Sequence, residues 1–132
     1  MVYYDVSTLG EVITVRFSAS APIYLQVMDH IKRAIVSGGL RPGERVESVR
    51  ALAARYGINL NTMQRACAEL EREGLIETRR GVGSFVTEDA ARLAALRERL
   101  AAELTEEFLA RMAALGFTRA ETAARLEKEG EQ

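Results

Sequence analysis

Apolar residues recur along this chain at two spacings, and each spacing predicts a different kind of element. Ile13, Val15 and Phe17 alternate with polar residues, and a period of two predicts a half-buried strand. Residues 3–6 could supply a partner strand across a turn at 8–10. An isolated pair of strands is only marginally stable, so a mobile segment is the open alternative.

Helical periodicity begins after Pro22, where apolar residues recur every three or four positions until the glycine pair at 38–39. This pattern predicts a helix over about 22–37. The chain's one histidine, His30, lies on this helix away from the apolar stripe. We expect it to be a solvated surface residue rather than a ligand or a catalytic base.

Two shorter helices follow, each with a recognisable start and end. Ser48 is a suitable N-cap for a helix over about 49–56, which Gly57 ends. Asn59 is the natural N-cap of a third helix, which ends at Gly74. Two short helices joined by a tight turn containing glycine are typical of a helix-turn-helix.

A β-hairpin is predicted directly after the third helix. Two short β-prone runs, at 75–78 and 84–87, are separated by the sequence Arg-Arg-Gly-Val-Gly at 79–83. Glycines between two such runs favour a hairpin, here with basic residues near its tip. A hairpin that follows a helix-turn-helix is a wing.

The last third of the chain is rich in Ala, Leu, Glu and Arg and predicts two helices. A stripe of apolar residues predicts one helix of about 25 residues ending near Gly116. Thr118 and Glu121 have the spacing of a capping box for a final short helix. This pair of helices cannot bury the stripe alone, so it needs the rest of the domain or a second chain. The stripe consists of Leu93, Leu96, Leu100, Leu104, Phe108, Met112 and Leu115.

Charge is distributed unevenly, although the formal net charge is only −1. Residues 1–87 carry 11 Lys or Arg against 9 Asp or Glu, whereas residues 88–132 carry 7 against 10. A mild basic excess in the first part suits an anionic partner, but an ordinary solvated surface explains it equally well. At 132 residues, the chain has room for one compact domain and an appendage.

Few residues with catalytic or metal-binding chemistry are present. Cys67 is the only cysteine, which excludes an intramolecular disulfide and a four-thiolate zinc site, and we expect it to be a small buried apolar residue. With one histidine and no clustered carboxylates, we expect no metal, no cofactor and no enzyme activity. There is no signal-peptide pattern and no apolar run near 18 residues, so we expect a soluble, cytoplasmic protein without a membrane segment.

The order of these elements, with two stretches of sequence, resembles the GntR family of bacterial transcription regulators. The stretches are PIYLQVMDHIKRAIVSGGLRPGERV and SVRALAARYGINLNTMQRACAELEREGLIETRRGVGSFV. The resemblance implies a mainly α fold with a small β wing. A winged helix-turn-helix DNA-binding domain over 22–87 would follow an N-terminal extension with a short strand over 1–21 and precede a two-helix dimerisation tail over 88–132. The matched positions are Ser48, Arg50, Leu52, Ala53, Gly57, Ile58, Thr62, Leu70, Glu73, Gly74, Leu75, Ile76, Gly81, Gly83, Phe85 and Val86.

Only 45 residues follow Thr87. A tail of this length resembles that of the short YtrA-like branch of this family. That branch implies a helical tail used for dimerisation, little room for a small-molecule effector, and often control of a transport operon. Its pattern is similar to Asn59, Asn61, Thr62, Gln64, Arg65 and Ala66 of this chain.

Three positions depart from the family pattern. Glu47 stands where the family often has proline, and it puts a carboxylate close to the expected path of the DNA phosphates. Leu60 and Gln64 stand where many members carry arginine. The base contacts of those relatives therefore do not transfer to this chain.

The third helix has the residues of a recognition helix, which presents its N-terminal part to the major groove. Asn61 and Gln64 can each pair with adenine, and Arg65 can pair with guanine. Arg50 resembles the family's DNA-contacting arginine, and glycines in the wing let its backbone approach the duplex. Taken singly, such side chains could equally cap a helix or coat a solvated surface. The residues expected to bind DNA are Ser48, Arg50, Asn59, Asn61, Thr62, Gln64, Arg65, Arg79, Arg80, Gly81 and Gly83.

The sequence therefore predicts a sequence-specific transcriptional regulator that binds double-stranded DNA. We expect a dimeric repressor on a roughly palindromic operator, paired through the Leu93 to Leu115 stripe. The alternative is a winged-helix module for protein interaction or assembly, since this fold also serves such roles.

Overall fold

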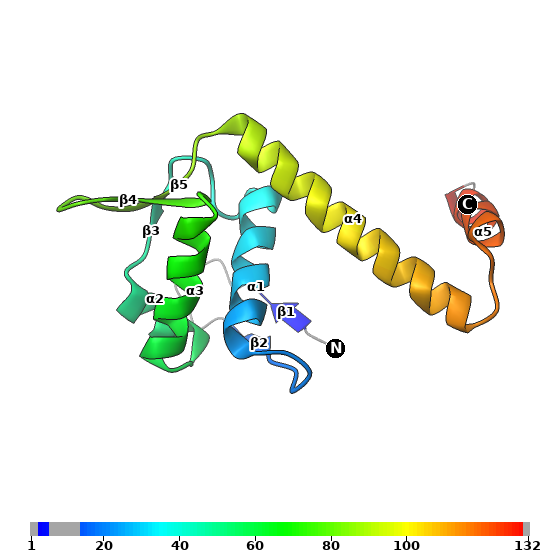
Figure 1. Ribbon diagram of the computed structural model, residues 1–132, viewed down its shortest axis with the longest axis horizontal. Helices are drawn as coiled ribbons and strands as arrows, with labels where there is room; N and C mark the ends of the chain where they lie inside the picture. The colour runs from blue at the N-terminus through cyan, green and yellow to red at the C-terminus, as the bar shows by residue number, and fades with distance from the viewer. Residues whose placement is uncertain (1–2, 6–13, 131–132) are drawn as a thin grey trace. The chain divides into compact units, whose positions relative to one another are not determined.

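The computed structural model describes residues 3–5 and 14–130, and the chain forms two compact units, Met1–Ala94 and Ala95–Gln132. Helices dominate both units, and strands occur only in the first among the described residues (Figure 1). This is the predicted mainly α fold with a small β wing. The elements are β1 (Tyr3–Asp5), β2 (Thr14–Arg16), α1 (Ile23–Ser37), β3 (Arg45–Val46), α2 (Val49–Tyr56), α3 (Leu60–Arg72), β4 (Ile76–Arg79), β5 (Gly83–Val86), α4 (Ala90–Ala114) and α5 (Arg119–Gly130).

The core of the first unit is built around the contact between α1 and α3, which lie side by side in Figure 1. Each helix contributes one apolar face, with residues three or four positions apart, as an amphipathic helix requires. Burial of these side chains is the main force that holds the unit together. The fully buried residues of the two helices are Val27, Met63, Ala66 and Leu70.

The helix-turn-helix has the boundaries and the caps that the sequence predicts. The Ser48 hydroxyl accepts a hydrogen bond from the Ala51 amide at 3.1 Å and so caps α2. Gly57 ends α2 with a φ of 65°, a left-handed conformation that favours glycine. The Asn59 side-chain oxygen accepts from the Asn61 amide at 2.8 Å and caps α3. Because each helix starts and stops on its own local signal, the turn between them is fixed to a few residues.

The predicted wing is confirmed as the antiparallel hairpin of β4 and β5, in which Thr78 is paired with Ser84. A third strand, β3, pairs with the other side of β5 and gives the strand order β3-β5-β4. The sequence analysis did not predict β3, because two residues are too few to show alternation. This strand ties the segment before α2 to the wing.

Near the N-terminus, β1 and β2 pair as antiparallel strands, with Tyr4 opposite Val15. The open question of a partner strand is therefore answered in favour of the pair. The predicted turn at 8–10 and the predicted strand residues Val6 and Ile13 lie outside the described residues.

The second unit carries most of α4 and all of α5, and α4 has 25 residues, as its stripe predicts. The capping box before α5 is present in both directions. The Thr118 amide donates to the Glu121 carboxylate at 3.1 Å, and the Glu121 amide donates to the Thr118 hydroxyl at 3.1 Å. Hydrogen bonding to the carboxylate from the Thr118 backbone, and then from the Thr118 side chain, lowers the pKa of Glu121 below its usual value, although this side chain is fully exposed.

The expectation for His30 is wrong, because only 2% of this residue is exposed. Its Nδ1 lies 2.5 Å from the Tyr56 hydroxyl of α2, with the two rings edge to face. His30 follows Val27 by three residues and precedes Ile31, so helical geometry places it beside the apolar stripe rather than opposite it. Burial lowers the pKa of His30 below 6.5; Asp29 opposes this shift and Arg33 adds to it.

Cys67 is half-buried in α3 rather than fully buried. Burial raises the pKa of its thiol, and so does the nearby Glu71 carboxylate. A raised pKa keeps the thiol protonated at neutral pH, which fits the expected inert residue and not a nucleophile.

Within residues 3–5 and 14–130, no helix is long and apolar enough to cross a membrane. The same part of the chain holds no group of three or more His, Cys, Asp or Glu placed to bind a metal ion.

Candidate nucleic-acid interface

The outer face of α3 is polar and free of the core. Met63, Ala66 and Leu70 are buried on one side of the helix, and a rotation of about 100° per residue puts Asn61, Gln64 and Arg65 on the opposite side. All three of these residues are exposed. The fold therefore presents the side chains that the sequence analysis selected for base recognition, on a helix with a rigid inner face.

Thr62 lies differently, since it is half-buried on the flank of the helix. The side-chain oxygen of Asn59 accepts the hydrogen bond that caps α3, and its NH₂ group is left as a donor. Of these two predicted contacts, Asn59 is the more accessible because it is exposed.

Charge along α3 favours an anion at its N-terminal end. No acidic residue lies in the first turn, where the helix dipole and the free amide groups attract negative charge. Glu69, Glu71 and Glu73 lie at the other end of the helix. An approaching polyanion is thus drawn to the part of α3 that carries Asn61 and Gln64.

Arg65 is held against α1. Its guanidinium carbon lies 3.9 Å from the centre of the Tyr24 ring, and Nη2 donates a hydrogen bond to the Tyr24 hydroxyl at 3.2 Å. A guanidinium stacked on an aromatic ring retains free donors at its edge. Arg65 is therefore displaced toward α1 and suits a phosphate on that side of the helix as well as a base.

The start of α2 adds a second polar group to the same unit. The Ser48 hydroxyl accepts the capping bond and still has its own hydrogen to donate, and Arg50 is exposed in the first turn of the helix. Glu47, the residue before the cap, is paired with Arg55 at 2.6 Å. The carboxylate that the sequence analysis placed near the phosphate path thus carries its own counter-charge.

The wing ends in a short turn with two arginines. The Val82 amide donates to the Arg79 carbonyl at 2.9 Å, and Gly81 within this turn has a φ of 76° that favours glycine. The Arg79 guanidinium lies over the Phe85 ring with its carbon 4.8 Å from the ring centre, while Arg80 is exposed. The hairpin projects beyond α2 and α3 in Figure 1, so its basic tip is accessible.

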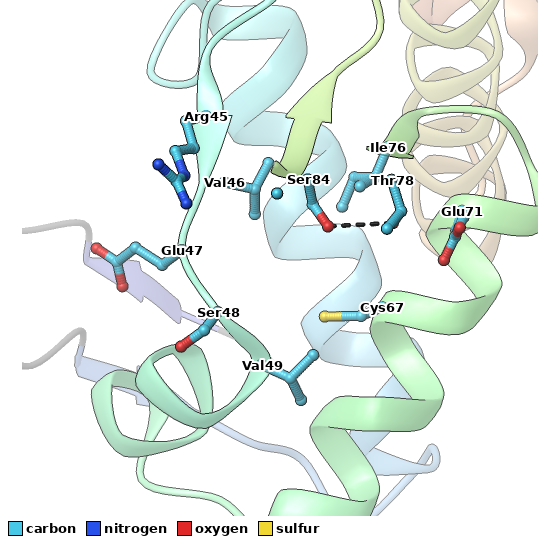
Figure 2. A pocket seen from close by; sticks show the side chains of 11 residues that line it. Arg45, Val46, Glu47, Ser48, Val49, Cys67, Glu71, Ile76, Thr78 and Ser84 are labelled. Atoms are coloured by element: carbon cyan, nitrogen blue, oxygen red, sulfur yellow. Dashed lines mark hydrogen bonds between the residues drawn. The ribbon is translucent and has the colours of Figure 1, made fainter. Parts of the chain in front are cut away.

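An open groove of about 630 Å³ lies between the wing, the start of α2 and one flank of α3 (Figure 2). Among the predicted DNA-binding residues only Ser48 and Gly83 line it; the groove is not where the recognition residues gather. Its other lining residues are Arg45, Val46, Glu47, Val49, Cys67, Glu71, Ile76, Thr78 and Ser84.

Sequence reasoning did not single out two further exposed arginines, Arg45 and Arg72. Arg45 of β3 is exposed and lies so close to Gly83 that a Cβ on this glycine would come within 3.1 Å of the guanidinium. Arg72 is exposed at the far end of α3, where it pairs with Glu69. No local signal marks Arg45, because its neighbour in the wing is 38 positions away in the sequence. Arg72 lies about two helical turns after Arg65 on the same helix, so helical spacing could have indicated it.

Taken together, these features define a winged helix-turn-helix with an exposed polar recognition helix. The profile of the family described as "Bacterial regulatory proteins, gntR family" matches residues 23–86 of this chain. The uncharacterized HTH-type transcriptional regulator YhcF of Bacillus subtilis is 42% identical over 106 residues, which cover 80% of this chain and 88% of YhcF. The chain therefore belongs to the GntR family, and it is a DNA-binding transcriptional regulator.

Three further comparisons agree with this assignment. The HTH-type transcriptional repressor YtrA of Bacillus subtilis is 44% identical over 54% of this chain and 55% of YtrA. A GntR family transcriptional regulator from Listeria monocytogenes has a similar structure, with a TM-score of 0.76 and 40% identity over 85% of this chain and 98% of that one. The AraR DNA-binding domain, solved in complex with operator ORX1, matches 55% of this chain and 93% of its own with a TM-score of 0.50 and 26% identity. These relatives do not favour the protein-interaction module.

Proposed function

We propose that this protein is a dimeric repressor that binds a roughly palindromic operator through α3 in the major groove. The observation that carries the proposal is the capped start of α3. It leaves Asn61 and Gln64 exposed on the face opposite the core, with no acid in the first turn. The solved AraR complex supports operator binding by this kind of domain.

Each predicted residue then has a distinct part in the complex. Asn61 and Gln64 read base edges, and Arg65 contacts a base or a phosphate beside α1. Thr62 bonds a phosphate or touches a base methyl, and Asn59 donates its amide to the backbone. Ser48 and Arg50 contact phosphates at the start of α2. Arg79, Arg80, Gly81 and Gly83 bring the wing to the adjoining backbone or minor groove.

We assign dimerisation to the helical tail, residues 88–132. The expected N-terminal extension covers 1–21 and the expected DNA-binding domain covers 22–87. Along the α4 stripe, Leu96 and Leu100 are buried, and Leu93 and Met112 are half-buried. Leu104, Phe108 and Leu115 are 44%, 41% and 74% exposed. Large apolar side chains on one face of a helix favour a second copy of the same face, because a dimer would remove them from water.

A dimer places two recognition helices on one duplex. In such dimers the half-sites lie about 34 Å, or one helical turn, apart, so the operator mirrors the two-fold symmetry of the protein. Occupation of such a site at a promoter would block RNA polymerase in the bacterial cytoplasm. The YtrA name supports repression, and the resemblance to that branch makes a transport operon the natural candidate for control.

The experiment is in vitro selection of duplexes from a randomised library with the full-length protein, followed by gel-shift titration. On the selected duplex, Asn61→Ala should cost about 1–3 kcal/mol, with little effect on a random duplex, because base contacts carry specificity. Arg50→Ala should weaken binding to both duplexes. It should also reduce the slope of the logarithm of the binding constant against the logarithm of the salt concentration by about 0.9.

The matched control for Arg50→Ala is Arg41→Ala, which removes the same charge from an exposed loop between α1 and β3. The control should keep wild-type affinity. Unchanged affinity in both Asn61→Ala and Arg50→Ala would overturn the proposed site. Binding that scarcely depends on salt would instead favour a protein-interaction module.

A further inference from the structure

Glu47 and Arg55 form an ion pair that joins the segment before α2 to the last turn of the same helix. Nη1 of Arg55 donates to Oε1 of Glu47 at 2.6 Å. The two residues are eight positions apart and Glu47 lies outside the helix, so the pair does not follow from ordinary helical spacing. Its geometry is set by the path of the chain between β3 and α2.

The arginine of this pair is placed more firmly than the glutamate. The Arg55 side chain is 26% exposed, and its Nε is buried without a hydrogen-bond partner among the described residues. The Glu47 side chain is 41% exposed. A partly buried guanidinium has few positions open to it, so Arg55 holds the carboxylate rather than the reverse.

Glu47 lies on the surface at the start of α2, next to the residue that caps this helix. It directly precedes Ser48, whose hydroxyl caps α2, and its carboxylate lies on the same side of the strand as Arg45 (Figure 2). The start of a helix attracts anions. A free carboxylate here would compete with a DNA phosphate for the amide groups of α2 and would repel that phosphate.

We propose that Arg55 is a positioning residue for DNA binding. It neutralises Glu47 and holds the Glu47 carboxylate away from the DNA phosphates that Ser48 and Arg50 contact. This inference rests on the proposed function, which places those two residues against phosphates. A paired carboxylate acts on a phosphate as a weak dipole rather than as a full negative charge. The pair lets this chain carry glutamate beside its DNA-contacting helix.

The test is a double-mutant cycle in the full-length protein on the selected duplex at low salt. Arg55→Ala should lower affinity about fivefold, the effect of one like charge at close range in water. Glu47→Gln should bind within twofold of the wild type or more tightly. The double variant Glu47→Gln with Arg55→Ala should regain most of the lost affinity, and Arg55→Lys should keep it. The loss in Arg55→Ala should also shrink as salt rises.

Three outcomes would overturn the inference. The first is an Arg55→Ala variant that binds like the wild type. The second is a double variant as weak as Arg55→Ala, which would mean that Arg55 only supports the fold. The third is a Glu47→Gln variant as weak as Arg55→Ala, which would mean that the pair itself is required.

Two controls keep the result interpretable. Thermal melting checks each fold, and if Arg55→Ala is unfolded at the assay temperature, Arg55→Gln replaces it with the same expectation. Asn61→Ala and Arg50→Ala are measured on the same duplex. If Asn61→Ala and Arg50→Ala weaken DNA binding while Arg55→Ala does not, this inference alone fails. If neither Asn61→Ala nor Arg50→Ala weakens DNA binding, the proposed function fails.

Discussion

Arg65 of the recognition helix is stacked on Tyr24 of α1, with its guanidinium carbon 3.9 Å from the ring centre and Nη2 3.2 Å from the hydroxyl. The two residues are 41 positions apart in the sequence. The contact fastens an exposed side chain of α3 to the first turn of another helix. In the proposed complex, Arg65 would therefore be oriented before DNA binds and would lose less side-chain freedom on binding.

This contact should be measurable in the unbound protein. A cycle of Tyr24→Ala, Arg65→Ala and the double variant should give a coupling of about 0.5–1 kcal/mol in the free energy of unfolding, the usual size of an exposed cation–π contact. Urea titration followed by circular dichroism provides the measurement. Tyr24→Phe keeps the ring and should retain most of the coupling. Strictly additive single variants would show that the stacking contributes nothing in solution.

His30 gives the stability of the protein a dependence on pH. Burial holds the folded-state pKa of His30 below its usual 6.5, so the unfolded chain takes up a proton first as the pH falls. The stabilisation from neutral His30 is complete above about pH 6.5 and is lost as the pH falls below this value. Acidification should therefore lower the melting temperature.

The comparison is with His30→Gln, which has no titrating ring. Circular dichroism melts of both proteins between about pH 7.5 and pH 5.5 should show a steeper fall for the wild type. Parallel curves would mean that His30 does not take part in the pH dependence.

The turn of the helix-turn-helix depends on Gly57. Its φ is 65°, and a Cβ at this position would meet nothing within 4 Å. The cost of Gly57→Ala is thus conformational rather than steric and should be about 1–2 kcal/mol in urea unfolding. Gly57→Asn should cost less, because asparagine tolerates the left-handed conformation better. Equal costs for the two variants would point to a contact made by the added side chain instead.

Most of the helices could be predicted because their signals are local. Ser48 and Asn59 cap the helices that they precede, and Thr118 with Glu121 forms the expected capping box. Each cap acts within three residues, so spacing alone identifies it. The wing was also visible in the sequence, since the glycines at its turn lie between two β-prone runs.

What could not be predicted depends on residues far apart in the sequence. Strand β3 has two residues and exists because β5 pairs with it. The position of His30 beside the apolar stripe follows from helical spacing, but its partner Tyr56 lies on another helix, 26 positions away. Within the candidate site, the exposure of Asn61 and Gln64 follows from periodicity, whereas the partners of Arg65 and Glu47 require the folded chain. Side-chain partners across elements are tertiary facts, and no local pattern carries them.

The proposed dimer makes a sharp prediction for the α4 stripe. Leu104 and Phe108 are exposed neighbours on one face of the helix. Replacement of Phe108 by glutamate would put a charge into a buried apolar interface, which is costly without a partner. Phe108→Glu should therefore be a monomer in light scattering at concentrations where the wild type is a dimer.

Ala102→Glu is the matched control, because Ala102 is exposed and helical geometry puts it opposite the stripe. This control adds the same charge to the same helix and should remain a dimer. A chain truncated after Glu88 should also be a monomer. A dimer that persists in both Phe108→Glu and the truncated chain would remove the tail from this role and place the pairing surface in the first unit. In a monomer, each recognition helix binds one half-site alone, so Phe108→Glu should also lose most of its affinity for the selected duplex while keeping the melting behaviour of the DNA-binding unit.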